Sequence, residues 1–146
     1  MTSIADLKIL IVEDNKTNQL VAKALLEKIG CLADTADDGF KGVKAVQEHP
    51  YDLVFMDMQM PGMDGLEATR QIRHQQGEAG PFIIALTANA LGIDRQACYD
   101  AGMDGYISKP ATLEKMRLAV EGVAKRLSSD QPESDNTDPI EASSDE

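Results

Sequence analysis

The segment Lys8-Ile9-Leu10-Ile11-Val12-Glu13-Asp14 joins a short apolar run to two acidic residues. The segment Asp52-Leu53-Val54-Phe55-Met56-Asp57 also ends an apolar run with an acidic residue. Apolar runs this short, without alternating polar positions, are typical of strands buried on both faces. Such strands belong to parallel sheets that helices cover on both sides, so the two segments predict an α/β protein.

Outward from these segments, strand and helix patterns alternate along the chain. Three more strands are expected at residues 32–36, 82–86 and 105–108. Five helices are expected at residues 15–29, 38–49, 64–75, 90–101 and 112–127. Because right-handed crossovers connect parallel strands, five strands of this length favour a doubly wound parallel sheet with the flavodoxin-like order 2-1-3-4-5.

The spacing of apolar residues predicts which side chains share the apolar face of two helices. In the first helix these are Leu20, Ala24 and Leu25. In the second helix they are Phe40, Val43 and Val46.

Charge and composition divide the 146 residues into a folded domain at 6–127 and an acidic tail at 128–146. The tail holds seven acidic residues and no Lys or Arg, so residues 1–127 carry only −4 of the net charge of −11. A polar, acidic tail is expected to be disordered. A mildly acidic body without clustered basic residues argues against direct nucleic-acid binding.

Other features indicate a cytoplasmic protein with no membrane span. The chain has no apolar run of 18 residues and no secretory signal at its start. Its two cysteines, Cys31 and Cys98, lack metal-type spacing and are interpreted as reduced thiols.

Polar residues follow the strands where a parallel sheet collects its functional groups, at the carboxyl ends. Glu13 and Asp14 follow the first strand, Asp57 the third, Thr87 the fourth and Lys109 the fifth. Three carboxylates in one place repel one another unless a proton or a cation joins them, and all-oxygen ligands favour Mg²⁺. Lys109 and Thr87 could interact with a phosphoryl group, while one carboxylate acts as nucleophile and forms an acyl phosphate.

Four motifs together strongly resemble the receiver domain of two-component response regulators over about residues 6–127. They are Glu13-Asp14 after Ile9-Leu10-Ile11-Val12, Met56-Asp57-Met58-Gln59-Met60-Pro61-Gly62-Met63-Asp64-Gly65, Leu86-Thr87-Ala88-Asn89-Ala90, and Gly105-Tyr106-Ile107-Ser108-Lys109-Pro110. Two details, Asn15 with Asn18 and the stretch 101–106, look most like receivers of hybrid kinases and phosphorelays.

The resemblance implies a role for each matching residue. Asp57 looks like the phosphoacceptor for a phosphohistidine donor, with Lys109 as the counter-charge of the phosphoryl group. The resemblance also implies that Asp14, Asp57 and the main-chain carbonyl of Gln59 bind Mg²⁺ directly, with Glu13 assisting through water. It implies that Thr87 and Tyr106 form a switch pair, in which the Tyr106 ring turns inward from an exposed position. The peptide bond between Lys109 and Pro110 is expected to be cis.

The same resemblance implies a phosphorylated switch protein that assists its own phosphorylation and dephosphorylation, and not a classical enzyme. Its donor partner is expected to be a histidine kinase or histidine phosphotransfer protein. Because no effector domain follows the fifth helix in this sequence, output is expected through protein contact, with the fourth helix, fifth strand and fifth helix as the surface that changes, or through parts absent from this chain. Gln59 and Asn89 are expected to tune the lifetime of the acyl phosphate.

Two other protein classes share parts of this pattern. A haloacid dehalogenase-type phosphatase uses a second Asp two residues after its nucleophile, where this chain has Gln59. A flavodoxin-like electron carrier binds a flavin phosphate after the first strand, where Glu13 and Asp14 would repel it. Within the receiver hypothesis, Met1 and the acidic tail favour a stand-alone regulator over a receiver cut from a hybrid kinase.

Overall fold

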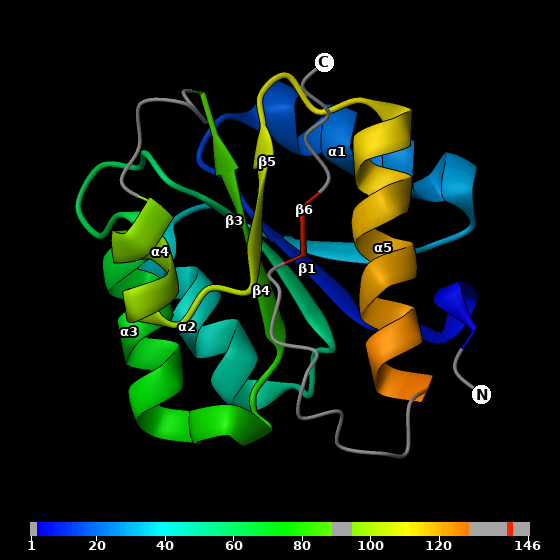
Figure 1. The fold of residues 1–146 in the computed structure, drawn as a ribbon. Helices are drawn as coiled ribbons and strands as arrows, with labels where there is room; N and C mark the ends of the chain where they lie inside the picture. Colours follow the sequence, from blue (N-terminus) through cyan, green and yellow to red (C-terminus); the bar gives the residue numbers. More distant parts are fainter. Residues whose placement is uncertain (1–2, 89–94, 129–139, 142–146) are drawn as a thin grey trace.

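The computed structural model describes residues 3–88, 95–128 and 140–141 (Figure 1). Five parallel strands lie in the order β2-β1-β3-β4-β5, which confirms the predicted doubly wound sheet. Their bounds are β1 (Ile9–Val12), β2 (Ala33–Ala36), β3 (Leu53–Asp57), β4 (Phe82–Thr87) and β5 (Gly105–Ser108).

A sixth strand was not expected from the sequence. The two-residue β6 (Ile140–Glu141) pairs in parallel with β5, opposite Gly105 and Tyr106. The sequence predicts a disordered tail at 128–146, whereas residues 140–141 of this tail pair with the sheet. A strand at the edge of a sheet presents unpaired backbone groups, which an extended segment can satisfy. The rest of the tail, 129–139 and 142–146, lies outside the described residues.

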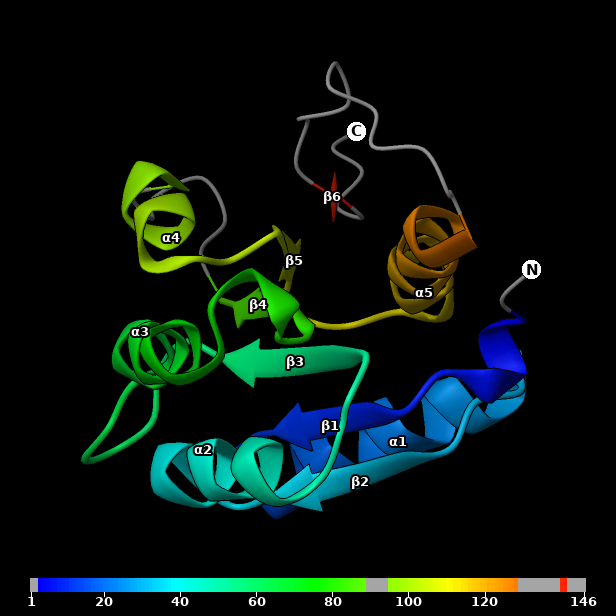
Figure 2. The same cartoon turned by 90° about the horizontal axis from the view of Figure 1, so that it is seen from below.

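Helices cover both faces of the sheet (Figure 2). The helices α1 (Lys16–Ile29) and α5 (Leu113–Ser128) pack side by side on one face. The other face carries α2 (Gly39–Glu48), α3 (Gly65–Gln76) and the described part of the fourth helix, α4 (Arg95–Ala101). Two short 3-10 helices also occur, η1 (Ile4–Asp6) and η2 (Gly77–Ala79). Within the described residues, no helix has both the length and the apolar character needed to cross a membrane.

The first three helices begin where a capping side chain occurs in the sequence. Asn15, Asp38 and Asp64 each accept a hydrogen bond from the backbone N–H three residues later, at 2.8–2.9 Å. Such caps satisfy backbone donors that have no partner within the helix. Of the predicted fourth helix, residues 90–94 lie outside the described residues.

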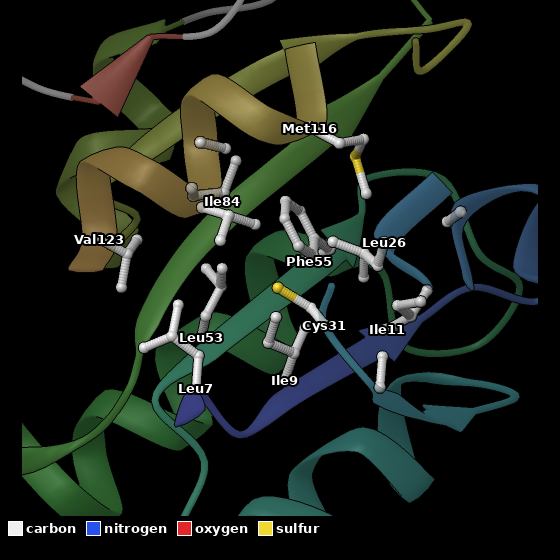
Figure 3. Close-up of a cluster of buried hydrophobic side chains, with 14 of the residues drawn as sticks. Leu7, Ile9, Ile11, Leu26, Cys31, Leu53, Phe55, Ile84, Met116 and Val123 are labelled. Atoms are coloured by element: carbon white, nitrogen blue, oxygen red, sulfur yellow. The ribbon is translucent and has the colours of Figure 1, made fainter. Parts of the chain in front are cut away.

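Each face of the sheet has its own apolar core. Ile9, Ile11 and Phe55 face α1 and α5, where Leu26 and Met116 complete the cluster (Figure 3). The intervening strand residues, such as Leu10 and Val54, belong to the cluster beneath α2 and α3. The strand residues that face each of the two cores are buried, which explains why the sequences of these strands are continuously apolar.

The predicted inward face of α1 is correct only at Leu25, which is partly buried and packs against the core. Leu20 is 68% exposed and Ala24 is also exposed, whereas Gln19, Ala22 and Leu26 are buried. Gln19 can be buried because its amide donates to the Glu13 carbonyl at 2.7 Å and to Asp37 Oδ1 at 2.8 Å. A hydropathy pattern does not detect a polar side chain whose hydrogen bonds are satisfied inside the protein.

The predicted face of α2 is correct at two of its three positions. Val43 and Val46 are buried, but Phe40 is 60% exposed at the start of the helix.

Candidate functional site at the carboxyl edge of the sheet

The structure brings the predicted acidic residues together at one edge of the sheet. Glu13 and Asp14 follow β1, and Asp57 is the last residue of the neighbouring strand β3. One carboxylate oxygen from each of the three lies within 4.8 Å of the others. Glu13 and Asp57 are each 2% exposed, while Asp14 is open to solvent. The site therefore has a buried floor and one exposed carboxylate.

Lys109 supplies the positive charge that faces these carboxylates. Its Nζ lies 3.0 Å from Asp57 Oδ1 and 3.3 Å from Glu13 Oε1. Its backbone N–H donates to the Thr87 carbonyl at 2.6 Å, which anchors the loop after β5 to the end of β4. The Lys109–Pro110 peptide bond is cis, as predicted.

The electrostatics of the site favour a bound cation. Burial, the hydrogen bond to Asp57 and the negative charge of Asp57 together raise the pKa of Glu13 to about 7, although the Lys109 charge and the Asn15 backbone N–H lower it. Burial alone would lower the pKa of Lys109, but its hydrogen bond to Asp57 and the charges of Asp57 and Glu13 outweigh burial and raise it. Three carboxylates with one ammonium leave excess negative charge on hard oxygen ligands, a donor set that fits Mg²⁺.

Gln59, a predicted Mg²⁺ ligand, lies beside Asp57, the predicted phosphoacceptor. Its backbone N–H donates to Asp57 Oδ1 at 3.2 Å, which holds one oxygen of that carboxylate. Ligation by the Gln59 carbonyl stays a prediction. Asn89, predicted to act with Gln59, lies outside the described residues.

Thr87 and Tyr106, the predicted switch pair, are both buried, at 3% and 5% exposure. The expected exposed starting position of the Tyr106 ring is therefore wrong for this structure. The ring belongs to the apolar cluster beneath α2 and α3, and the Arg95 guanidinium carbon lies 4.9 Å from the ring centroid. Sequence reasoning missed this role of Arg95, because no local pattern pairs a helix residue with a strand eleven residues later.

A pocket of about 380 Å³, which no sequence pattern indicates, opens beside the charged site. Glu13 and Lys109 line its polar end. Its remaining walls are mostly apolar and come from α1, the end of β4 and the loop before α5: Asn18, Val21, Ala22, Leu86, Pro110 and Ala111. The exposed side chains of Leu20 and Val21 lie on the same helix.

The comparisons with known proteins agree with this geometry. Residues 9–121 match the model of the response regulator receiver domain. Over 121 residues the chain is 45% identical to hybrid signal transduction histidine kinase K of Dictyostelium discoideum, covering 78% of this chain and 10% of that protein. It is 40% identical to the sensor histidine kinase GacS of Pseudomonas protegens, covering 77% of this chain and 13% of that protein. The chain thus spans about a tenth of the length of these relatives.

Two solved structures are also similar. The receiver domain of the Pseudomonas aeruginosa sensor histidine kinase PA1611, solved with a magnesium ion coordinated in its active site cleft, has a TM-score of 0.75 and 39% identity; the match covers 82% of this chain and 98% of that one. The Saccharomyces cerevisiae Ssk1 receiver domain, co-crystallised with the histidine phosphotransfer protein Ypd1, has a TM-score of 0.78 and 28% identity, with 86% and 93% coverage. The fold, the acidic edge and the family match converge: the chain belongs to the response regulator receiver domain family.

Proposed function

We propose that this receiver domain takes a phosphoryl group onto Asp57 from a phosphohistidine. One observation carries the proposal: the buried Asp57 carboxylate lies 3.0 Å from the Lys109 ammonium and beside two further carboxylates. In the transfer, an Asp57 oxygen forms a bond to phosphorus while the bond from phosphorus to the histidine nitrogen breaks, and the imidazole leaves with that electron pair. The product is an acyl phosphate on Asp57.

Asp14, Asp57 and the Gln59 carbonyl would hold Mg²⁺, with Glu13 assisting through water. The ion would neutralise charge on the phosphoryl oxygens. Lys109 pairs with the phosphoryl group in place of its present pairing with Asp57, and the Thr87 hydroxyl donates a hydrogen bond to a phosphoryl oxygen. Gln59 and Asn89 flank the approach of the water that hydrolyses the product and set its lifetime.

The donor is a histidine kinase or a histidine phosphotransfer protein. Supporting this partner, the Ssk1 receiver was solved with such a phosphotransfer protein, and the chain resembles receivers of hybrid kinases. The apolar pocket next to Lys109, with the exposed Leu20 and Val21, offers a surface for docking beside the nucleophile. We place the protein in the cytoplasm, with no direct nucleic-acid contact, because its net charge is negative and Cys31 and Cys98 are not joined in a disulfide.

The chemistry is tested by incubation with acetyl phosphate, with and without Mg²⁺, followed by intact mass spectrometry. The wild-type protein is expected to gain one phosphoryl group in Mg²⁺. Asp57→Asn should gain none, because an amide is not a competent nucleophile, and Asp14→Ala should react more slowly. Asp52→Asn is the matched control, because Asp52 directly precedes the first residue of β3 and so lies at the opposite end of the strand from Asp57. This variant should be labelled as wild type is. Labelling of Asp57→Asn at the wild-type rate would refute the assignment.

Phosphorylation is proposed to switch the face formed by α4, β5 and α5. The new phosphoryl oxygens attract the Thr87 hydroxyl, and the movement changes the packing around Tyr106 and Arg95 behind it. Shifting a population from about 1:99 to 99:1 takes roughly 5.5 kcal/mol. A few charge-assisted hydrogen bonds, at roughly 1.5–3 kcal/mol each, could supply this difference.

The switch is tested by amide NMR with and without beryllofluoride, a phosphoryl mimic. Wild type is expected to show shifts at Asp57 and across α4, β5 and α5. Thr87→Ala should bind the mimic but lose most of the distant shifts. Shifts confined to the surroundings of Asp57 in wild type, or a full pattern in Thr87→Ala, would contradict the coupling.

A further inference from the structure

Lys115, in the first turn of α5, makes a set of contacts that the proposed chemistry does not use. Its Nζ lies 2.9 Å from Ser108 Oγ, 3.1 Å from the Ser108 carbonyl oxygen and 3.4 Å from the Pro110 carbonyl oxygen. A lysine ammonium has three N–H donors, and here three acceptors surround it. The side chain thus reaches back from the helix to the end of β5.

The backbone of Lys115 secures the other end of the same loop. Its N–H donates to Thr112 Oγ1 at 3.2 Å, the capping bond at the start of α5. One residue therefore ties the loop between β5 and α5 at its beginning, through Ser108 and Pro110, and at its end, through Thr112.

Lys109 lies between the two carbonyls that Lys115 binds. Its own N–H is bonded to the Thr87 carbonyl, so the backbone on both sides of Lys109 is held in place. This restraint matters because the Lys109 side chain extends to Asp57 Oδ1 at 3.0 Å while remaining 26% exposed. Packing alone does not enclose a side chain that is open to this degree.

We propose that Lys115 is a positioning residue that fixes the loop between β5 and α5 and so keeps the Lys109 ammonium at the phosphoryl site. The inference rests on the proposed function, since Lys109 is the phosphoryl counter-charge there. It predicts a selective defect. The acidic residues Glu13, Asp14 and Asp57 belong to β1 and β3 and their following loops, which Lys115 does not contact, so Mg²⁺ binding should not weaken.

The test compares Lys115→Met with wild type in three measurements: the rate of labelling by acetyl phosphate, the affinity for Mg²⁺ alone and the binding of beryllofluoride. Because misplacing a reacting group by about 1 Å can cost about 100-fold in rate, we expect labelling to slow by about tenfold. Mg²⁺ affinity should be equal to or tighter than that of wild type, and beryllofluoride should bind more weakly. A loss of overall structure would instead weaken all three.

Three further variants sharpen the result. Lys115→Arg retains charged donors at the same place and should restore most of the labelling rate. Lys125→Met removes an exposed lysine from the last turn of the same helix and should behave as wild type. Ser108→Ala removes one acceptor and leaves the lysine, so a smaller slowing is expected. This variant tests the contact even if Lys115→Met fails to fold.

The outcomes separate the two proposals. If wild type is labelled at Asp57 and both Lys115→Met and Ser108→Ala are labelled at the wild-type rate, the positioning role is refuted and the proposed function stands. Equal weakening of Mg²⁺ binding and labelling in the folded Lys115→Met protein would also refute it. If wild type itself takes no phosphoryl group on Asp57, the proposed function fails first.

Discussion

At the residue scale, the position of Glu13 in the site disfavours the ionised form of its carboxyl group. Its carboxyl group is 2% exposed and lies next to Asp57, so its ionised form is disfavoured, and its pKa rises from 4.5 to about 7. Near neutral pH without a cation, the site thus holds a carboxyl group that is only partly ionised. A bound cation would favour the ionised form and release the proton.

The metal-free protein should therefore lose stability as pH rises from about 4.5 to 7. In this window the unfolded chain has already released the Glu13 proton while the folded protein retains it, so unfolding is favoured by rising pH. At about 1.4 kcal/mol per pKa unit, the loss across this window amounts to a few kcal/mol. Urea denaturation in EDTA across this range measures it.

Glu13→Gln removes the titrating group and should flatten this part of the pH dependence. Glu27→Gln, an exposed change on α1, should retain it. The explanation fails if Glu13→Gln and wild type show the same slope in EDTA. Adding Mg²⁺ to wild type should raise stability most at the upper end of the window.

At the scale of the element, α1 is attached to the sheet through a polar residue. The Gln19 amide bonds the Glu13 carbonyl and Asp37 Oδ1, and both acceptors lie in loops at the carboxyl edge. The helix therefore helps to hold the segment that carries Glu13 and Asp14. The apolar Leu20, one residue later, points away from the core and is 68% exposed.

Substituting Gln19 with an apolar residue and Leu20 with a polar one should change the stability of the protein in the opposite way to that suggested by hydropathy. Gln19→Leu removes both of these hydrogen bonds and deprives the Glu13 carbonyl of its Gln19 donor, so it should destabilise the protein by about 1–3 kcal/mol. Leu20→Gln should change stability by less than about 0.5 kcal/mol, as surface substitutions usually do. Chemical denaturation of both variants decides the question. A neutral Gln19→Leu would show that its hydrogen bonds add no net stability.

At the scale of the whole molecule, the described part of the acidic tail, β6, contacts both β5 and α5. The β6 strand pairs with β5 over two residues, on the edge of the sheet next to Tyr106. This contact is far smaller than the two apolar cores that hold the helices to the sheet. The tail is therefore expected to contribute little to the stability of the domain.

Truncation after Ser128 tests this expectation. At a net of about 1 kcal/mol per hydrogen bond, a two-residue strand contributes about 1–2 kcal/mol at most. The midpoint of thermal unfolding should therefore fall by only a few degrees, and labelling at Asp57 should keep the wild-type rate. A larger fall, or slower labelling, would show that the tail supports the domain beyond β6.

The strands, their order and the polar residues at their carboxyl ends could be predicted from the sequence alone. Strands that are buried on both faces must be continuously apolar, so the strands at residues 9–12 and 53–56 could be recognised from the local sequence. Glu13, Asp57 and Lys109 stand at the carboxyl ends of their strands, which predicts that they lie at one edge of the sheet. Helix starts were equally local, because Asn15, Asp38 and Asp64 cap the residues that follow them.

Tertiary structure alone decided which side chains are buried, and which support the site. Gln19 is buried because the loops after β1 and β2 together provide its acceptors. Tyr106 is buried because Arg95 and the apolar cluster cover its ring. Lys115 reaches its partners because the start of α5 lies close to the end of β5. Each outcome depends on groups brought together through space. The spacing of apolar residues describes the polarity of one helix or strand only, so it cannot identify the groups on other elements that bury or bind these side chains.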